Sequence, residues 1–516
     1  MLRLTWVQPE DLIGHELRQA EQDGRDASSV AARWRAAGGC EAPARAGASA
    51  RPASPRLRLL AEELLDELAE LPSPLAAVEP TELADIRALC PNWPAPAPTP
   101  HARSSRAPSA GAPYESGRAL PPGRVPQGPG TGAHRRGPRR GAESPAAPHP
   151  APASAPAART AVSRLEAAWL GRAAGCLLGK PVEKLPLEGI RRLARATGNW
   201  PPNTYFTARG LPPDLTAAYP WNRRSAATSL AENIDGMPED DDLDHPLLAL
   251  LLLQRHGKAF TTVDVARVWL DELPAGRAFT AERVAYRNLL TGLEPPHTAR
   301  HRNPFREWIG ALIRADVHGW TNPGDPAAAA GQAHRDAVLT HTANGVYAAM
   351  FTAAAIATAA TGTHDVHACL RAGLTVVPPA SRLAEAVRRA VRLAETHDDF
   401  DTVVHELHAR YSPTHHWVHA VPNTALIAAA LTHADGDFTG SVSRAVSGGW
   451  DTDSNGATAG SLAGLLAGAP DALPEHWTTP LKNRLATSVG DFDGTGFDTL
   501  AHLTHTEATR PCPRPS

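Results

Sequence analysis

Apolar residues recur at intervals of three and four along most of the chain after residue 160. This spacing places them on one face of a helix, and few stretches show the alternation that is typical of strands. Gly and Pro separate the successive segments. The pattern predicts an all-α fold in which residues 160–510 form one compact multi-helix domain. The clearest segments are 165–178, 246–256, 263–270, 327–337, 345–360, 383–394, 424–432 and 441–446.

The chain before residue 160 divides into two parts of different composition. Residues 1–90 contain helical patterns, most clearly at 56–72, and are predicted to form a short helical N-terminal region. Residues 91–159 are rich in Pro, Ala, Ser and Arg and have almost no branched apolar residues. Such a segment buries too little apolar surface to offset its ordering entropy, so we predict a disordered linker.

Composition and charge narrow the class of protein. The formal net charge is −3, which provides no overall field for nucleic acid or anionic lipid. Arginines at 135–140 form a local basic run, but a solvated linker is the favoured interpretation and no specific nucleic-acid binding is expected. The five cysteines form no Cys-x-x-Cys pair, and the longest apolar run, 247–253, is too short to cross a membrane. Together with the lack of a signal pattern at residues 1–10, these features predict a cytoplasmic protein without membrane association.

The stretch Gly448–Gly460 concentrates polar side chains where a loop meets a helix. Two glycines are followed by Asp451, Asp453 and Ser454, and then by small apolar residues at helical spacing. One interpretation is that these side chains cap the helix, because Ser and Asp oxygens accept the first free backbone N–H groups. Three oxygen-bearing groups exceed what one cap requires, however, and Mg²⁺ prefers oxygen ligands. The stretch therefore indicates a metal site.

A second acidic cluster, Glu239–Asp242, precedes a helix that begins near Pro246. Acidic groups stabilise a helix N-terminus, so capping is again one interpretation. Three consecutive Asp residues repel one another, and a divalent cation relieves this repulsion most directly. We predict that the two acidic loops converge and bind two Mg²⁺ ions, with Mn²⁺ as a possible substitute. The predicted metal ligands are Asp240, Asp241, Asp242, Asp451, Asp453 and Ser454.

Glycines at 171, 175 and 179 recur at every fourth position and form a small-residue stripe along one predicted helix. Tight packing against another helix is the favoured explanation. A Walker A phosphate loop is excluded, because no Lys-Ser/Thr pair follows the last glycine. Glu183 stands just beyond this helix, where an acidic side chain can face a cleft.

Three stretches together resemble the ADP-ribosylglycohydrolase family: Gly175–Glu183, Glu239–Asp242 and Gly448–Gly460. They occur in the family's order with suitable intervals, and the resemblance covers about residues 160–505. The Gly-Gly-Trp-Asp-Thr-Asp sequence in the third stretch is the most specific of the three. The resemblance implies a compact all-α bundle with a binuclear Mg²⁺ site.

The family's motifs resemble individual positions of this sequence. The Thr-Asp-Asp motif resembles Asp240–Asp242, with Asp in place of Thr, and a shift by one residue would use Glu239 instead of the last Asp. The second metal motif, Asp-x-Asp followed by Thr or Ser, resembles residues 451–454. The family's glutamate after the glycine-rich helix resembles Glu183, and Cys176 stands where the family usually has Asp. These departures indicate a divergent branch.

The resemblance implies a hydrolase that cleaves the N- or O-glycosidic bond between ADP-ribose and an acceptor. Its substrate would be an ADP-ribosylated protein or small molecule. Asp241 or Asp242 would orient or activate the water, and Glu183 would assist as a base or as a gate over the metals. Two alternatives are a non-catalytic ADP-ribose binder of the same fold and a metal-dependent phosphohydrolase. The residues leave the acceptor and the oligomeric state open.

Residues outside the acidic stretches are further candidates for substrate contacts. His341 and Asn344 either line the ribose or pyrophosphate pocket or tie a loop to the core. One aromatic residue before the acidic cluster could stack on adenine, although core packing is the expected role of any single one. These aromatic residues are Trp200, Tyr205, Phe206 and Trp221.

Overall fold

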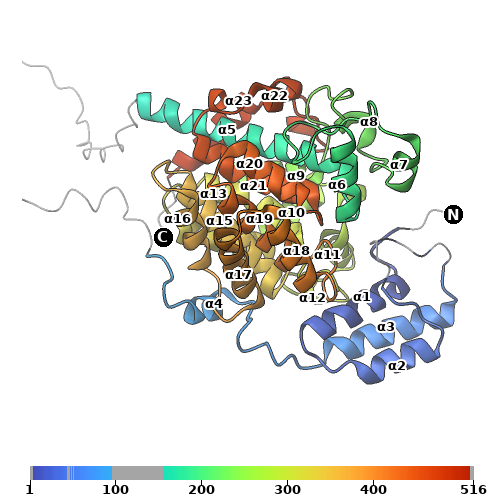
Figure 1. Cartoon of the computed structure of the whole chain (residues 1–516). Helices are drawn as coiled ribbons and strands as arrows, with labels where there is room; N and C mark the ends of the chain where they lie inside the picture. Colours follow the sequence, from blue (N-terminus) through green and yellow to red (C-terminus); the bar gives the residue numbers. More distant parts are fainter. Residues whose placement is uncertain (1–3, 43–46, 48, 50–51, 96–154, 512–516) are drawn as a thin grey trace, which may run out of the picture. The chain divides into compact units, whose positions relative to one another are not determined.

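Helices make up the regular secondary structure of the described part of the chain (Figure 1). The computed structural model describes residues 4–42, 47, 49, 52–95 and 155–511. Within these residues, strand-like pairing is limited to two isolated bridges, Met237 with Leu485 and Trp308 with His419. The prediction of an all-α fold is therefore confirmed. Most of the predicted linker, residues 96–154, lies outside the described residues.

The helices before the linker are α1 (Pro9–Gln22), α2 (Ser28–Ala36), α3 (Pro55–Ala69) and α4 (Leu83–Leu89). The helices that carry or support the candidate site are α5 (Ala155–Gly179), α9 (Asp241–His256), α19 (Ala420–His433), α20 (Phe438–Ser447) and α21 (Thr452–Ala467). The remaining α-helices are α6 (Leu187–Ala196), α7 (Pro213–Ala218), α8 (Ala226–Ser229), α10 (Thr262–Glu272), α11 (Thr280–Leu290), α12 (His297–Arg300), α13 (Asp316–Trp320), α14 (Pro326–Ala337), α15 (Ala343–Ala359), α16 (Val366–Leu374), α17 (Arg382–Thr396), α18 (Phe400–Tyr411), α22 (Glu475–Thr478) and α23 (Phe497–Thr509). Short 3₁₀ turns span Lys180–Val182, Ala275–Arg277, Ile309–Arg314, Pro470–Ala472, Thr479–Leu481 and Gly490–Phe492.

Local sequence signals account for several helix boundaries. The Ser54 hydroxyl accepts the Leu57 N–H at 3.2 Å, and a proline follows Ser54 at the first position of α3. Thr261 and Asp264 form a reciprocal capping box at the start of α10. The described helices include none that is long and apolar enough to cross a membrane.

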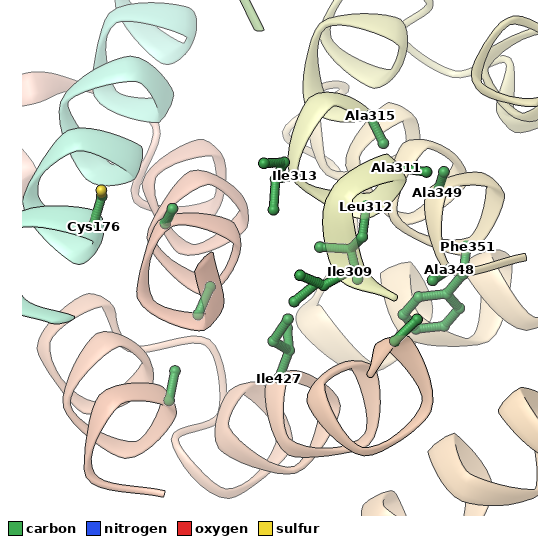
Figure 2. Close-up of a cluster of buried hydrophobic side chains, with 14 of the residues drawn as sticks. Cys176, Ile309, Ala311, Leu312, Ile313, Ala315, Ala348, Ala349, Phe351 and Ile427 are labelled. Atoms are coloured by element: carbon green, nitrogen blue, oxygen red, sulfur yellow. The ribbon is translucent and has the colours of Figure 1, made fainter. Parts of the chain in front are cut away.

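The core is built around α15 and α19, which are rich in alanine and buried on nearly every face. Small side chains allow neighbouring helices to approach these two from several directions. Figure 2 shows Ile309, Leu312 and Ile313 of the turn at 309–314 in this core, with Ile427 of α19 facing Ile309. The acidic loops lead into helices α9 and α21, which pack on this core. Buried neighbours therefore hold the backbone at the start of each helix.

Helices α5 and α21 pack together through glycines on both sides. A Cβ placed on Gly175 would overlap the carbonyl oxygen of Gly456, and a Cβ on Gly456 would overlap that of Gly175. The same reciprocal relation holds one turn away between Gly171 and Gly460. Gly179 lies equally close to the backbone of residue 452 at the start of α21. The glycine stripe predicted from the sequence is therefore a helix–helix contact.

Buried ion pairs connect the N-terminal helical segment with the helices that follow residue 300. Arg382, the first residue of α17, donates to Glu79 at 2.6 Å and to Glu307 at 2.9 Å. Arg306 pairs with Asp23 at 3.0 Å. Burial raises the pKa of Glu307 to about 7. Removing one partner would leave a buried charge unpaired, which is strongly destabilising.

The glycine contact predicts a specific sensitivity to an added methyl group. Replacing Gly175 with Ala should lower the free energy of unfolding by about 2 kcal/mol, because the backbone carbonyl that the methyl group meets has no room to move. Gly276→Ala is the matched control, since a Cβ there meets open space, and it should change stability by less than about 0.5 kcal/mol. Denaturant unfolding followed by circular dichroism measures both. Equal stability of the two variants would contradict the close contact.

Candidate metal centre and active site

Three carboxylates from two helix ends form the Asp451 cluster, which consists of Glu183, Asp451 and Asp453. Glu183 follows α5 and its 3₁₀ turn, whereas Asp451 and Asp453 lie at the start of α21. One carboxylate oxygen of each residue lies within 4.8 Å of those of the other two. Asp451 and Asp453 are buried, and Glu183 is partly exposed. The cluster therefore opens toward solvent on the Glu183 side.

A second group, the Asp240 cluster, consists of Cys176, Asp240 and Asp242. The Cys176 thiol, on the face of α5 toward α9, lies 3.4 Å from Asp240 Oδ1 and 3.8 Å from Asp242 Oδ2. Asp240 caps α9 by accepting the Asp242 N–H at 3.0 Å. Burial, followed by the charges of Asp240 and Asp242, raises the pKa of the thiol well above its ordinary value. Cys176 therefore contributes a neutral S–H group.

Asp241 and Asp453 connect the two clusters electrostatically. Burial raises the pKa of Asp453 to about 7, with further contributions from the charges of Glu183 and Asp240. Burial also raises the pKa of Asp241 well above its ordinary value, and the charges of Asp240, Asp242, Asp453 and Glu183 add to this shift. Asp241 nevertheless keeps part of its surface exposed to solvent. The structure thus brings both acidic stretches and Glu183 into one region, with Asp241 on its more open side.

The capping interpretation accounts for only part of this arrangement. Asp240 caps α9, but the Asp451 side chain makes no capping hydrogen bond at α21. Burial, followed by the charges of Asp453 and Glu183, raises the pKa of Asp451 well above its ordinary value. Ser454 is buried in the first turn of α21, where its N–H donates to Asp453 Oδ1 at 3.1 Å. Asp451 is therefore placed among like charges without the benefit of capping.

A strained turn sets the direction in which α21 begins. Gly449 and Trp450 have φ angles of 81° and 60°, both in the left-handed region that non-glycine residues seldom adopt. The Trp450 ring stacks on His408 with centroids 4.2 Å apart. His408 Nε2 also lies 2.8 Å from the carbonyl oxygen of Gly448. These contacts hold the turn and so direct Asp451 toward the site.

Several polar residues that the sequence reasoning did not select surround the carboxylates. Lys180 forms an ion pair with Asp240, and Lys184 pairs with Glu183 at 2.7 Å. Asn222 donates to the other Glu183 oxygen at 2.6 Å. These lysines flank the Pro-Val-Glu sequence, which belongs to a stretch that resembles the family. Their position beside this motif was the signal in the sequence that could have identified them. Asn222 lies in a loop without any such signal.

Two further residues support the Asp451 cluster from α19 and the loop before it. The Asn423 side-chain oxygen accepts the N–H of Asp451 at 3.2 Å and the Asn455 amide at 2.8 Å. Asn423 in turn donates to the carbonyl oxygen of Trp417 at 2.8 Å. The ring of Trp417 lies 5.7 Å from the Lys184 ammonium. The segment before α19 therefore forms one wall of the site.

The other candidates for substrate contacts lie outside the two acidic clusters. His341 and Asn344 are fully buried, and they contact Thr340 at 2.6 Å and Glu307 at 3.0 Å respectively. These contacts match the alternative in which both residues tie a loop to the core. The aromatic residues divide into two sets: Tyr205 and Phe206 are buried in the core, whereas Trp200 and Trp221 are partly buried.

The residues present fit a divalent cation. Asp241, Asp242 and Asp451 all have raised pKa values because burial and neighbouring carboxylates disfavour their charged forms. A divalent cation would remove this repulsion, and clustered carboxylate oxygens are the donors preferred by Mg²⁺ and Mn²⁺. Among the described residues, the buried Asp451 side chain has its hydrogen bond with the neighbouring carboxylate of Asp453, to which it donates, and it forms no capping bond at α21. Because no capping N–H satisfies the Asp451 oxygens, these oxygens are well suited to bind a metal ion.

Comparison with known proteins places this geometry in a family. The family model for ADP-ribosylglycohydrolase matches residues 157–511, which is more than half of the chain. The chain belongs to the ADP-ribosylglycohydrolase family. Membership supports a glycosidase-type hydrolase and confirms the resemblance seen in the sequence. The acidic clusters described above are the groups in this family member that could bind metal.

One similar solved structure, an ADP-ribosylglycohydrolase-related protein complex, has 23% sequence identity and a TM-score of 0.43. The match covers 68% of this chain and 100% of that chain. No curated protein matches.

The raised pKa of Asp453 predicts how stability depends on pH when no metal is bound. A folded pKa of about 7, above the ordinary value of 3.8, means that the fold loses stability as pH rises from about 4 to about 7, because the folded state then keeps a proton that the unfolded chain has released. In a metal chelator, Asp453→Asn should therefore melt roughly 2 °C or more above the wild type at pH 8. This advantage should shrink at pH 6, where wild-type Asp453 is protonated.

Thermal melts of both proteins at the two pH values measure this effect as the difference in melting temperature between variant and wild type. The buried histidines titrate alike in both proteins, so their contribution to this difference cancels. Saturating Mg²⁺ should reverse the order at pH 8, because the wild type alone keeps the full carboxylate set. A melting difference that is the same at pH 6 and pH 8 would contradict the account of Asp453.

Proposed function

We propose that this chain is a divalent-cation-dependent hydrolase that cleaves the N- or O-glycosidic bond between ADP-ribose and an acceptor. The observation that carries the proposal is the convergence of Asp241, at the start of α9, with the Asp451 cluster, which joins the start of α21 to the segment after α5. Family membership supports the hydrolase class. The substrate would be an ADP-ribosylated protein or small molecule. A cytoplasmic location is part of the proposal, supported by free thiols at Cys40, Cys90, Cys176 and Cys369.

Mg²⁺ is the proposed cofactor, with Mn²⁺ as a substitute, because both accept carboxylate oxygens. The family resemblance implies two ions. When bound, such an ion orients ribose hydroxyls and makes a coordinated water more acidic. The candidate ligands are Asp240, Asp241, Asp242, Asp451, Asp453 and Ser454, together with Glu183.

We assign the proton transfer, the orientation of water and the stabilisation of charge to side chains of this chain. Asp241 has the most open position among the aspartates and a raised pKa, so its carboxylate is suited to accept the proton of the attacking water. Asp242 would orient that water from the start of α9. Glu183 is held by Lys184 and Asn222, and it would assist as a base or as a gate at the partly exposed side. The surrounding carboxylates would stabilise the positive charge that develops at the anomeric carbon.

Substitution of the carboxylates tests this proposal. Asp451→Asn and Asp241→Asn should each reduce the release of ADP-ribose by at least about 100-fold, since one removes a metal ligand and the other the proposed base. Both should keep the helical fold. Glu188→Gln is the matched control, because the Glu188 side chain is 72% exposed at the start of α6 and should retain full activity.

The measurement is mass spectrometry of products from a panel of ADP-ribosylated substrates with arginine, serine, nucleobase and small-molecule acceptors. Release of inorganic phosphate instead of ADP-ribose would favour the phosphohydrolase alternative. Binding of ADP-ribose without turnover of any substrate would favour the non-catalytic alternative.

A further inference from the structure

The two acidic clusters differ in how their oxygens are satisfied. In the Asp240 cluster, both Asp240 oxygens have close donors, and the Asp242 oxygens have longer contacts. Asp240 Oδ1 accepts the Asp242 N–H at 3.0 Å and faces the Cys176 thiol at 3.4 Å, while Asp240 Oδ2 is paired with Lys180. Asp242 Oδ1 lies 3.5 Å from Arg172, and Asp242 Oδ2 lies 3.8 Å from the thiol. Asp240 therefore has a fixed counter-ion within the protein, whereas the single Cys176 S–H is shared between Asp240 and Asp242.

The Lys180 ammonium is built into the Asp240 cluster. Its side chain is only 7% exposed, and its Nζ lies 3.2 Å from the carbonyl oxygen of Glu239 in addition to its pairing with Asp240. Lys180 directly follows Gly179, which is pressed against the first residue of α21. The backbone position of Lys180 is therefore fixed by the contact between α5 and α21. A divalent cation bound to Asp240 would have to displace this ammonium or lie beside it, against the repulsion of like charges.

The Asp451 cluster has the opposite character. Its lysine, Lys184, has a side chain that is 42% exposed, and within the described part of the chain its ion pair is with Glu183. Asn222 and the Ser454 N–H supply one hydrogen bond each, to Glu183 and Asp453. The Asp451 carboxylate receives no capping bond and faces Asp453. The three carboxylates thus have one directly paired ammonium, that of Lys184, while Lys180 acts on Asp453 through its charge alone. This balance leaves negative charge for a divalent cation.

We propose that the Lys180 ammonium takes the place of a second metal ion, so that this chain binds one divalent cation, at Glu183, Asp451 and Asp453. The inference rests on the proposed cation site and specifies its occupancy. Lys180 supplies positive charge at the Asp240 cluster as a fixed hydrogen-bond donor, and it cannot generate a bound hydroxide as a metal can. Water activation then belongs to the side of the site formed by the Asp451 cluster and Asp241.

Cation stoichiometry tests the proposal without reference to activity. Isothermal titration of Mn²⁺ into the metal-stripped full chain should give one ion per chain. Lys180→Met removes the ammonium but keeps a long apolar side chain, and it should raise the stoichiometry to two by freeing Asp240 Oδ2. Lys184→Met is the matched control and should remain at one, because Lys184 does not contact the Asp240 cluster. Two ions per wild-type chain, or one ion in Lys180→Met, would overturn the proposal.

A second measurement covers the case in which Lys180→Met does not fold. Electron paramagnetic resonance of the wild type saturated with Mn²⁺ should show the spectrum of an isolated ion. The spectrum of a spin-coupled pair would overturn the proposal while leaving cation-dependent hydrolysis intact. No binding of Mn²⁺ or Mg²⁺ to the wild type would overturn both the single-ion site and the proposed function.

Discussion

The backbone contact between α5 and α21 is the constraint on which the site depends. Glycines on both helices allow carbonyl groups of one helix to touch the backbone of the other, so the separation is set by main-chain atoms. The Thr452 hydroxyl adds a hydrogen bond of 2.8 Å to the carbonyl oxygen of Gly179. The end of α5 and the start of α21 are thereby fixed together. Glu183 and the two aspartates of α21 meet as a direct consequence.

Buried carboxylates are the second consequence of this arrangement. The fold places Asp242 and Asp451 where burial and neighbouring charges disfavour ionisation, which lowers the stability of the metal-free protein at neutral pH. Lysine relieves part of this strain at Asp240, where an ammonium is enclosed. Asp242 and Asp451 keep this strain, and at Asp451 it is the feature that a bound cation would remove. Local instability in the metal-free chain is thus the physical reason for expecting metal affinity.

Much of the fold followed from local patterns in the sequence. Helical spacing after residue 160 predicted the all-α fold, and glycines at every fourth position predicted a close helix contact, because both properties depend on neighbours along the chain. The acidic loops were also visible, since each immediately precedes a helix. The role of capping was not resolved by sequence, because Asp240 caps its helix and Asp451 does not, although both occupy the same kind of position.

The groups that balance the carboxylates depend on long-range contacts, which spacing does not reveal. Asn222 reaches Glu183 across 39 positions, and Lys180 reaches Asp240 across 60. Asn222 is marked by no local pattern, and for Lys180 the only signal was its position beside the Pro-Val-Glu sequence, which does not reveal its partner. For His341 the sequence left two roles open, and only its complete burial beside Thr340 distinguishes them.

The central claim is that the converging carboxylates form a divalent-cation site. Anomalous diffraction from crystals grown with Mn²⁺ tests it most directly, because it locates the ion independently of any substrate. The account predicts an anomalous peak at coordination distance from the carboxylates of Glu183, Asp451 and Asp453. A map with Mn²⁺ peaks only at exposed surface carboxylates, and none at this cluster, would contradict it.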